Sequence, residues 1–137
     1  MIIGFNFTKI SAEKKGNPKG NIKVKNNITI TDVDESKSNI GKGKKAVNFK
    51  FKFSSEFNPD IGSIEIEGNV ADLTDEKDSA KLVKEWKKNK NVTKEFAARI
   101  LSKALRECSV EAITLSKEMN LPSPVPLPKI ENKGAKK

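Results

Sequence analysis

Few side chains in this sequence have a type and spacing that could carry catalysis. The chain has no histidine and a single cysteine, Cys108, so it lacks the commonest general base and cannot form an internal disulfide. Asp32, Asp34 and Glu35 could bind a cation, but acidic residues clustered in a loop are usually solvated. The run Gly41-Lys-Gly-Lys-Lys45 lacks P-loop spacing and follows no expected strand. The residues therefore predict a protein that is not an enzyme and uses no metal and no cofactor.

Positive charge is the second feature that could bind a ligand. Lys and Arg number 27 against 18 Asp and Glu, which gives a net charge of +9. This balance favours an anionic partner such as RNA, DNA or a membrane surface, although lysine clusters are about as often plain solvated surface. The chain has no tyrosine and its phenylalanines fall mostly on expected core positions, so nucleic-acid contacts would be made to phosphates and would weaken with salt. The candidate nucleic-acid-binding residues are Lys42, Lys44, Lys45, Lys84, Lys87, Lys88 and Lys90.

A third feature is the apolar, proline-rich strip of residues 121–130, Leu-Pro-Ser-Pro-Val-Pro-Leu-Pro-Lys-Ile. Its four prolines stand at alternate positions and favour an extended, polyproline-like conformation. Such a strip must lie on apolar surface, either as an ordered tail of its own domain or as the border of a groove that takes up another chain. The candidate peptide-binding residues are Phe57, Trp86, Leu121, Val125, Leu127 and Ile130. Phe57 and Trp86 are included because we expect them to be exposed.

The strip follows the clearest helix of the sequence, expected over residues 93–119. Its apolar residues recur at steps of three and four and fall on one face. They are Phe96, Ile100, Leu101, Ala104, Leu105, Cys108, Ala112, Leu115 and Met119. We expect Cys108 to lie in the core and Thr93 to be the N-cap. A shorter helix is expected from Thr74 or Asp75 to about Lys88.

Four segments alternate between apolar and polar residues and are expected to be strands. They cover residues 2–11, 22–30, 47–53 and 64–70. Ile10 has the wrong parity for its strand, which predicts a bulge or a strand end near Lys9. Asn26 interrupts the apolar face of the second strand, where we expect a bulge or a departure from the core.

The third and fourth segments are expected to form a hairpin, because Asn58, Pro59 and Asp60 favour a turn. Parity then sets which side chains share a face. The expected opposite pairs are Phe53 with Ile64, Phe51 with Ile66, Lys52 with Glu65, and Lys50 with Glu67. The charged pairs would lie on the outer face of the sheet, where opposite charges stabilise by about 0.2–1 kcal/mol per pair.

The order of these segments predicts an α+β fold. We expect a four-stranded antiparallel β-meander with the long C-terminal helix packed on one face and a shorter helix before it. Residues 1–131 are expected to form a single domain, followed by a basic C-terminal tail at 132–137. No apolar run approaches the roughly 18 residues of a membrane span and no signal peptide is visible, so we expect a cytoplasmic protein without membrane insertion.

Two stretches resemble a known family. The run Arg106-Glu-Cys-Ser-Val-Glu-Ala-Ile113, followed by Asn120 and the strip, is similar to the C-terminal part of the SecB family of protein-export chaperones. The start, Phe7-Thr-Lys-Ile-Ser-Ala-Glu13, is similar to that family's first strand. The resemblance implies a cofactor-free homo-oligomer that binds unfolded polypeptide clients in apolar grooves. The strip positions Leu121, Val125, Leu127 and Ile130 are the matching apolar residues.

Charge separates this chain from that family. SecB-type chaperones are typically acidic and use acidic surface to meet the translocase motor, whereas this chain carries +9. Two functions therefore remain open: a SecB-like module that holds non-native or extended polypeptides, and a basic RNA- or ribosome-associated protein. Binding in an apolar groove should survive salt, whereas RNA binding should collapse as salt rises.

Overall fold

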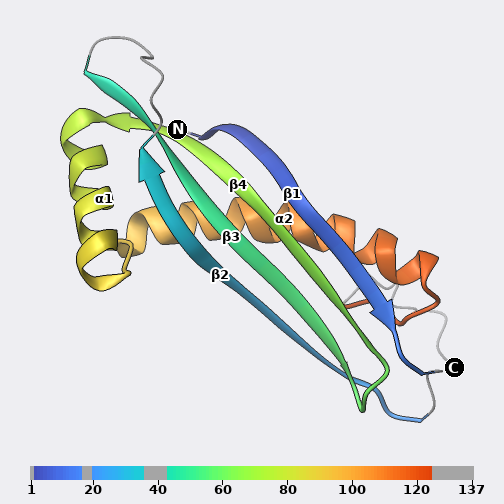
Figure 1. Cartoon of the computed structure of the whole chain (residues 1–137). Coiled ribbons are helices and arrows are strands. Elements are labelled where there is room, and N and C mark those ends of the chain that lie inside the picture. Colours follow the sequence, from blue (N-terminus) through green and yellow to red (C-terminus); the bar gives the residue numbers. More distant parts are fainter. Residues whose placement is uncertain (1, 17–19, 36–42, 125–137) are drawn as a thin grey trace, which may run out of the picture.

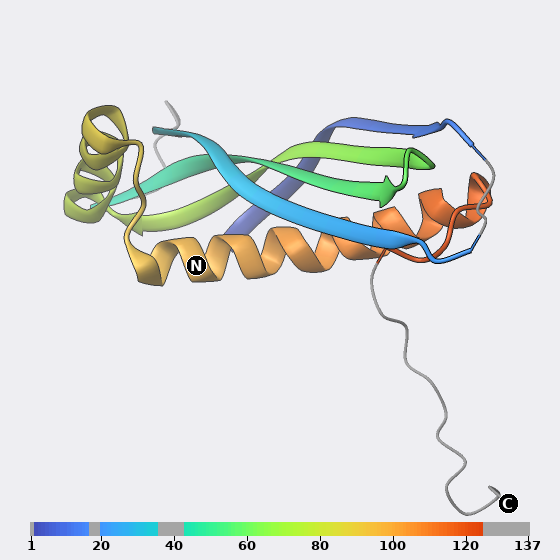
Figure 2. The ribbon, with the colours of Figure 1, turned by 90° about the horizontal axis from the view of Figure 1, so that it is seen from below.

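The computed structural model describes residues 2–16, 20–35 and 43–124. Its elements are β1 (Ile2–Lys14), β2 (Lys23–Glu35), β3 (Lys44–Asn58), β4 (Gly62–Asp75), α1 (Glu76–Asn89) and α2 (Lys94–Glu118). The strands form one twisted antiparallel sheet, α2 runs across one face of it, and α1 lies at the end where β2 and β4 finish (Figures 1 and 2). The α+β prediction, with its two helices after four strands, is confirmed.

The strand order is β1-β4-β3-β2. Consecutive strands pair through β2, β3 and β4, but β1 pairs with β4, which gives a Greek-key order. A plain four-strand meander would have put β1 beside β2. Alternation reports which face a side chain occupies and carries no information on which strands are neighbours. The consequence is that β1 and β2 form the two opposite edges of the described sheet.

The inner face of the sheet carries the apolar residues that the alternating sequence pattern predicted. On β3, Phe49, Phe51, Phe53 and Phe57 are all buried against the helical layer. On β1 the pairing shifts between Phe7 and Lys9, which confirms the predicted bulge. The extra residue reverses the parity, so that the second half of β1 presents Ile10 and Ala12 opposite the buried Ile66 and Ile64 of β4.

Gly68 lets two elements approach β4 closely on this inner face. A Cβ atom there would stand 2.7 Å from Phe51 Cζ and would also collide with the backbone oxygen of Asn6. The Phe51 ring in turn stacks on Phe5 at a centroid distance of 5.5 Å. The glycine therefore leaves the space beside β4 that the Phe51 ring occupies.

The hairpin register differs from the expected one by two residues. Phe53 lies opposite Ile66, and Lys52 lies opposite Glu67. The turn comes one residue later than expected, because Phe57 continues the buried alternation of β3 and its carbonyl accepts the Ile61 N–H at 2.9 Å. An even shift keeps every side chain on its face, so the expected inner and outer sets are correct.

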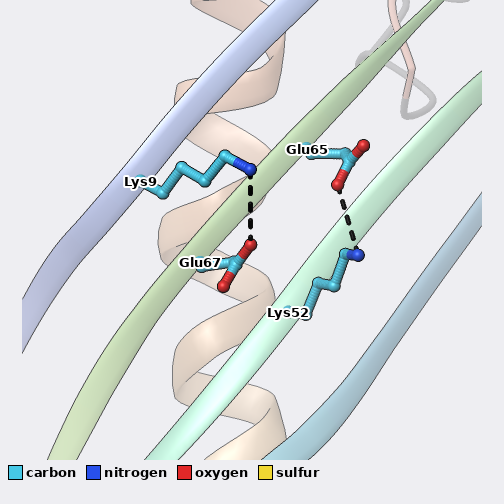
Figure 3. Close-up of polar contacts among 4 residues, drawn as sticks. All are labelled: Lys9, Lys52, Glu65 and Glu67. Carbon is cyan, nitrogen blue, oxygen red and sulfur yellow. Dashed lines mark ion pairs between the residues drawn. The ribbon is translucent and has the colours of Figure 1, made fainter.

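The outer face carries ion pairs across the strands (Figure 3). Lys52 Nζ lies 3.2 Å from Glu65 Oε1, as a diagonal pair, and Lys9 Nζ lies 3.9 Å from Glu67 Oε2. Glu67 was expected beside Lys50, which the register places opposite Asn69 instead. These partly exposed pairs contribute about 0–1 kcal/mol each. They keep this face polar, opposite the face that α2 covers.

Both helices begin close to where they were expected. Asp75 and Thr93 are the N-cap residues, and neither side chain makes a capping hydrogen bond. The Asp75 carboxylate instead accepts a hydrogen bond from Lys44 Nζ at 2.7 Å. That bond, with the lysine charge, lowers the pKa of Asp75 below its usual value. Helix α1 is tied to the end of β2 by Ser79 Oγ, which donates to Glu35 Oε2 at 2.6 Å.

Candidate functional site

The buried residues of helix α2 form one narrow central row. The row repeats every four residues and is fully or almost fully buried. Its members are Ile100, Ala104, Cys108, Ala112 and Ser116. The burial of Cys108 confirms its predicted core position, and it raises the pKa of the thiol to about 12, with smaller contributions from Glu107 and Glu111. Cys108 is therefore a packing residue and not a nucleophile at neutral pH.

The flank of α2 that faces β1 is closed by charged side chains. Arg99 Nη2 lies 2.6 Å from Oδ2 of Asp72, a carboxylate that is fully buried on the inner face of β4. One turn further, Lys103 Nζ pairs with Glu107 Oε2 at 3.1 Å and stands 5.8 Å from the centroid of the Phe5 ring on β1. This β1 flank joins the helix to the sheet through the Arg99–Asp72 ion pair and the cation–π contact of Lys103, whereas the Lys103–Glu107 pair lies within α2.

The flank that faces β2 is apolar and open. Leu101, Leu105, Ser109 and Ile113 repeat every four residues and form a second row beside the central one. Leu105 remains 43% exposed. Leu105 and Ser109 line a cavity of about 330 Å³ together with residues from β2 and β3. We call this cavity the β2–α2 groove, and its lining residues are Asn26, Asn27, Ile28, Phe53, Leu105 and Ser109.

Asn26 is one of two asparagines in the strand wall of the groove. Its Oδ1 accepts a hydrogen bond from Ser55 Oγ at 2.5 Å, and its Nδ2 donates to the Pro124 carbonyl at 2.6 Å. The side chain is therefore satisfied on both sides and does not mark a bulge. The register shift of β2 lies further on, between Ile30 and Asp32. Asn26 thus holds the start of the proline strip at one end of the groove.

The described part of the strip, residues 121–124, lies against its own domain. Leu121 is buried, and its N–H donates to the Ser116 carbonyl at 2.7 Å. Its Cδ2 would be 3.4 Å from a Cβ at Gly62, at the end of the β3–β4 hairpin. Pro124 is buried as well. The other strip residues chosen for peptide binding, Val125, Leu127 and Ile130, lie outside the described residues.

The exposure expected for Phe57 and Trp86 is wrong. Phe57 is 1% exposed and Trp86 is 7% exposed. Phe57 shares the parity of Phe53 and points into the core, where turn-rich sequence around it had suggested a surface position. Trp86 follows Leu82 by one helical turn and is covered by the core, with Lys90 Nζ 5.5 Å from its ring centroid. Neither side chain lines the β2–α2 groove.

The described candidate lysines differ in their contacts, and Glu35 lies beside both Lys45 and the three lysines of α1. Lys44 pairs with Asp75, Lys45 Nζ lies 3.9 Å from Glu35 Oε1, and Lys90 stands over Trp86. Lys42 lies outside the described residues. The remaining three share a shallow pocket on α1, which is lined by Glu35, Ala80, Val83, Lys84, Lys87 and Lys88.

Sequence reasoning missed the open groove because it treated the apolar face of α2 as uniform. Leu101 and Leu105 were placed in the core with the central row, but they lie at its margin. A signal was present: a helix that covers one sheet through a narrow row of small residues leaves large residues at its margin partly exposed. Asn26 inside an otherwise apolar strand face was the second signal.

Within the described ranges, no cluster of three or more His, Cys, Asp or Glu side chains could hold a metal ion. The same ranges contain no helix that is long and apolar enough to cross a membrane. The β2–α2 groove places apolar side chains next to a sheet edge.

The fold has counterparts among solved structures. No family model matches the chain, and no curated protein matches its sequence. A solved structure of a Mycobacterium tuberculosis SecB-like chaperone, in complex with a ChAD peptide from the HigA1 antitoxin, is similar with a TM-score of 0.56 and 16% identity. The match covers 96% of this chain and 89% of that one. At such low identity the similarity shows the fold alone, and this chain shares the fold of a SecB-like chaperone.

Proposed function

We propose that the chain is a cytoplasmic, cofactor-free, SecB-like chaperone module that holds non-native or extended polypeptides in the β2–α2 groove. The observation that carries the proposal is the groove itself. Its helix wall is formed by Leu105 and Ser109, in a helical row that Leu101 and Ile113 continue, and its strand wall is an edge strand of the described sheet. An extended client can bury alternate side chains against that row while its backbone pairs with the edge of β2.

The structural match supports polypeptide as the ligand class. The similar Mycobacterium protein is a SecB-like chaperone whose structure contains a peptide from an antitoxin. The chemistry of the groove agrees with such a ligand, because each aliphatic client side chain buried there contributes about 1.5–3 kcal/mol before ordering costs. This apolar contribution does not depend on salt in the way that phosphate contacts do.

A pair of substitutions on α2 tests the proposal. Leu105→Asp places a charge in the helix wall of the groove. Val110→Asp places the same charge on the same helix, but Val110 is 64% exposed and is not among the groove residues. Affinity for a fluorescently labelled, reduced and carboxymethylated polypeptide is measured by anisotropy at 50 to 500 mM salt. We expect Leu105→Asp to weaken binding about tenfold or more and Val110→Asp to leave it within about twofold.

Several outcomes would reject the proposal. Equal losses in both variants would mean that the groove is not the site. Binding of a short RNA that falls steeply with salt, without polypeptide binding, would support the RNA- or ribosome-associated alternative. In that case substitution of Lys84, Lys87 and Lys88 by Glu should abolish the RNA signal, since these three lysines gather on α1.

Assembly into a homo-oligomer is part of the proposal. Both edge strands of the described sheet, β1 and β2, have no further partner strand among the described residues, and an uncovered edge invites pairing with another strand. The exposed Ile3 on β1 adds apolar surface to that edge. A mass that stays monomeric over a wide concentration range, measured by light scattering, would exclude assembly through these edges.

A further inference from the structure

The basic pocket on α1 is a second concave surface, separate from the β2–α2 groove. We call it the α1 pocket, and its lining residues are Glu35, Ala80, Val83, Lys84, Lys87 and Lys88. Helix α1 lies at the end of the sheet where β2 finishes, whereas the groove is formed by the first half of β2 and the middle of α2 (Figure 1). The two surfaces share no lining residue.

The three lysines of the α1 pocket are crowded on one helix. The positions three and four residues from Lys84 hold Ala80, Lys81, Lys87 and Lys88, and none of them is acidic. Like charges at these spacings destabilise a helix. Lys87 and Lys88 lie in the last turn, where the helix dipole favours cations, but Lys84 lies before that turn. The helix therefore carries repulsion around Lys84 that nothing in its own sequence offsets.

The rest of the described chain does not neutralise these lysines either. The pocket lining contains one carboxylate, that of Glu35. This carboxylate accepts a hydrogen bond from Ser79 Oγ at 2.6 Å and lies 3.9 Å from Lys45 Nζ, so it already has partners. Among the described residues, none of the three lysines of the pocket takes part in an ion pair. The α1 pocket thus has an excess of positive charge.

The α1 pocket also contains aliphatic surface. Ala80 and Val83 stand four residues before Lys84 and Lys87; Ala80 is exposed and Val83 is half-buried. The described lining residues include no aromatic side chain, so a nucleic-acid base would have no ring to stack on. A polypeptide that carries carboxylates next to an aliphatic side chain would use both the lysines and the apolar surface. This combination favours an acidic polypeptide over RNA.

We propose that the α1 pocket is a docking site for an acidic segment of a partner protein. Ala80, Lys84 and Lys88 follow one another at one helical turn, about 6 Å along the axis. Alternate side chains of an extended chain point to one side about 7 Å apart. An aliphatic residue followed by two acidic residues, all at alternate positions, therefore matches the three helical positions. The docking site does not depend on the proposed function, because it uses a different surface.

Peptide binding to the full-length chain tests the docking site. The probe is a short fluorescent peptide with leucine and two glutamates at alternate positions and serines between them, and its affinity is measured by anisotropy. Lys84→Glu with Lys88→Glu should weaken binding about tenfold or more. Lys23→Glu with Lys117→Glu is the matched control, since it makes the same charge change at exposed positions at the opposite end of the molecule (Figure 1). It should weaken binding less than about threefold.

Two further measurements guard against loss of folding and against simple charge attraction. Lys84→Gln with Lys88→Gln introduces no new charge and should give an intermediate loss. A peptide with glutamines in place of the glutamates should not bind detectably. A peptide with serine in place of leucine should bind about threefold or more weakly, also at high salt, because apolar burial is not screened. Equal affinity of the leucine and serine peptides, or equal losses from the two pairs of glutamate substitutions, would overturn the docking site.

The remaining outcomes separate this docking site from the other candidates. Leu105→Asp should leave the affinity for the acidic peptide within about twofold, and a large loss would mean that the peptide occupies the β2–α2 groove instead. An oligouridine that binds more tightly than the peptide and is lost with Lys84→Glu and Lys88→Glu would assign the pocket to nucleic acid and overturn the proposal. If the acidic peptide binds the pocket but no unfolded polypeptide binds the groove, the proposed function fails and the docking site stands.

Discussion

The two flanks of α2 differ in chemistry although they belong to one helix. On the β1 flank, Arg99 reaches a buried carboxylate, and its side chain is 44% exposed. On the β2 flank, Leu105 is 43% exposed and faces a cavity. Equal exposure thus has opposite meanings: the arginine completes an ion pair, whereas the leucine leaves apolar surface uncovered. One helix can be fixed on one side while it offers a binding surface on the other.

This division predicts that substitutions on the two flanks affect different properties of the protein. Charges on the β1 flank should affect the free energy of unfolding, and side chains on the β2 flank should affect polypeptide affinity. The central row lies between the two flanks. Its burial should change neither when polypeptide binds nor when a flank residue is substituted. Four measurements would break or sharpen the contrast, beginning with the largest expected effect.

Cys108 tests whether the central row stays closed. At pH 8 a thiol with the ordinary pKa of 9.0 is about one tenth thiolate, whereas one with a pKa of about 12 is about one ten-thousandth thiolate. Labelling with a thiol reagent should therefore be about a thousandfold or more slower in the native chain than in urea. Saturating polypeptide should not accelerate it. Faster labelling with polypeptide would mean that clients lift α2 from the sheet, and the contrast between flanks would fail.

The same thiol predicts the direction of the alkaline response. Its pKa is raised in the folded chain, so between pH 9 and 12 the unfolded chain loses this proton before the folded one does. Its contribution to stability is fully present below about pH 9 and is lost as pH rises toward 12. Urea midpoints should fall over this window, and Cys108→Ala should reduce the fall.

Arg99→Met tests the closed flank. The substitution leaves the buried Asp72 carboxylate without its arginine, which should lower the free energy of unfolding by about 3 kcal/mol. Lys103→Met removes a partly exposed pair from the same flank and should cost less than about 1 kcal/mol. Urea denaturation gives both values. Polypeptide affinity at low temperature should be unchanged in each, and a loss with Arg99→Met in folded protein would place the β1 flank in the binding site.

Ser109→Leu tests the open flank by adding an aliphatic side chain to it. Ser109 interrupts the aliphatic row of the β2 flank, so a leucine there should add about 1 kcal/mol to polypeptide binding, or about fivefold in affinity. Ser102→Leu is the same change at an exposed position of the helix that does not line the groove. It should leave the affinity unchanged. Equal gains from both substitutions would mean that polypeptide binds any apolar surface of α2.

Much of the fold follows from local patterns, because parity and helical spacing decide which side chains are buried. The bulge before Ile10 and the core position of Cys108 were predictable in this way. Phe57 was misjudged because turn-forming residues next to it were weighted above its parity with Phe53. The two-residue error in the hairpin has the same origin, since burial of Phe57 moves the turn.

Features that depend on distant parts of the chain were not predictable. The position of β1 beside β4 depends on which edge is free, and alternation says nothing about it. The role of Asn26 depends on Ser55 and Pro124, which are 29 and 98 residues away in sequence. The two flanks of α2 differ because one faces the charge of Asp72 and the other faces β2. A helical wheel shows the width of the apolar face but not what stands opposite each side.

The Greek-key order also determines when the fold can be completed during synthesis. Partner positions on β1 and β4 are separated by about 50 to 70 residues. At about 5–20 residues per second, several seconds pass between the translation of β1 and that of its partner. The hairpins of β2, β3 and β4 join neighbours in sequence and can form as they emerge from the ribosome. Strand β1 is thus synthesised before the other three strands but is paired last. Until β4 has been synthesised, Phe5 and Phe7 have no sheet to pack against in the nascent chain.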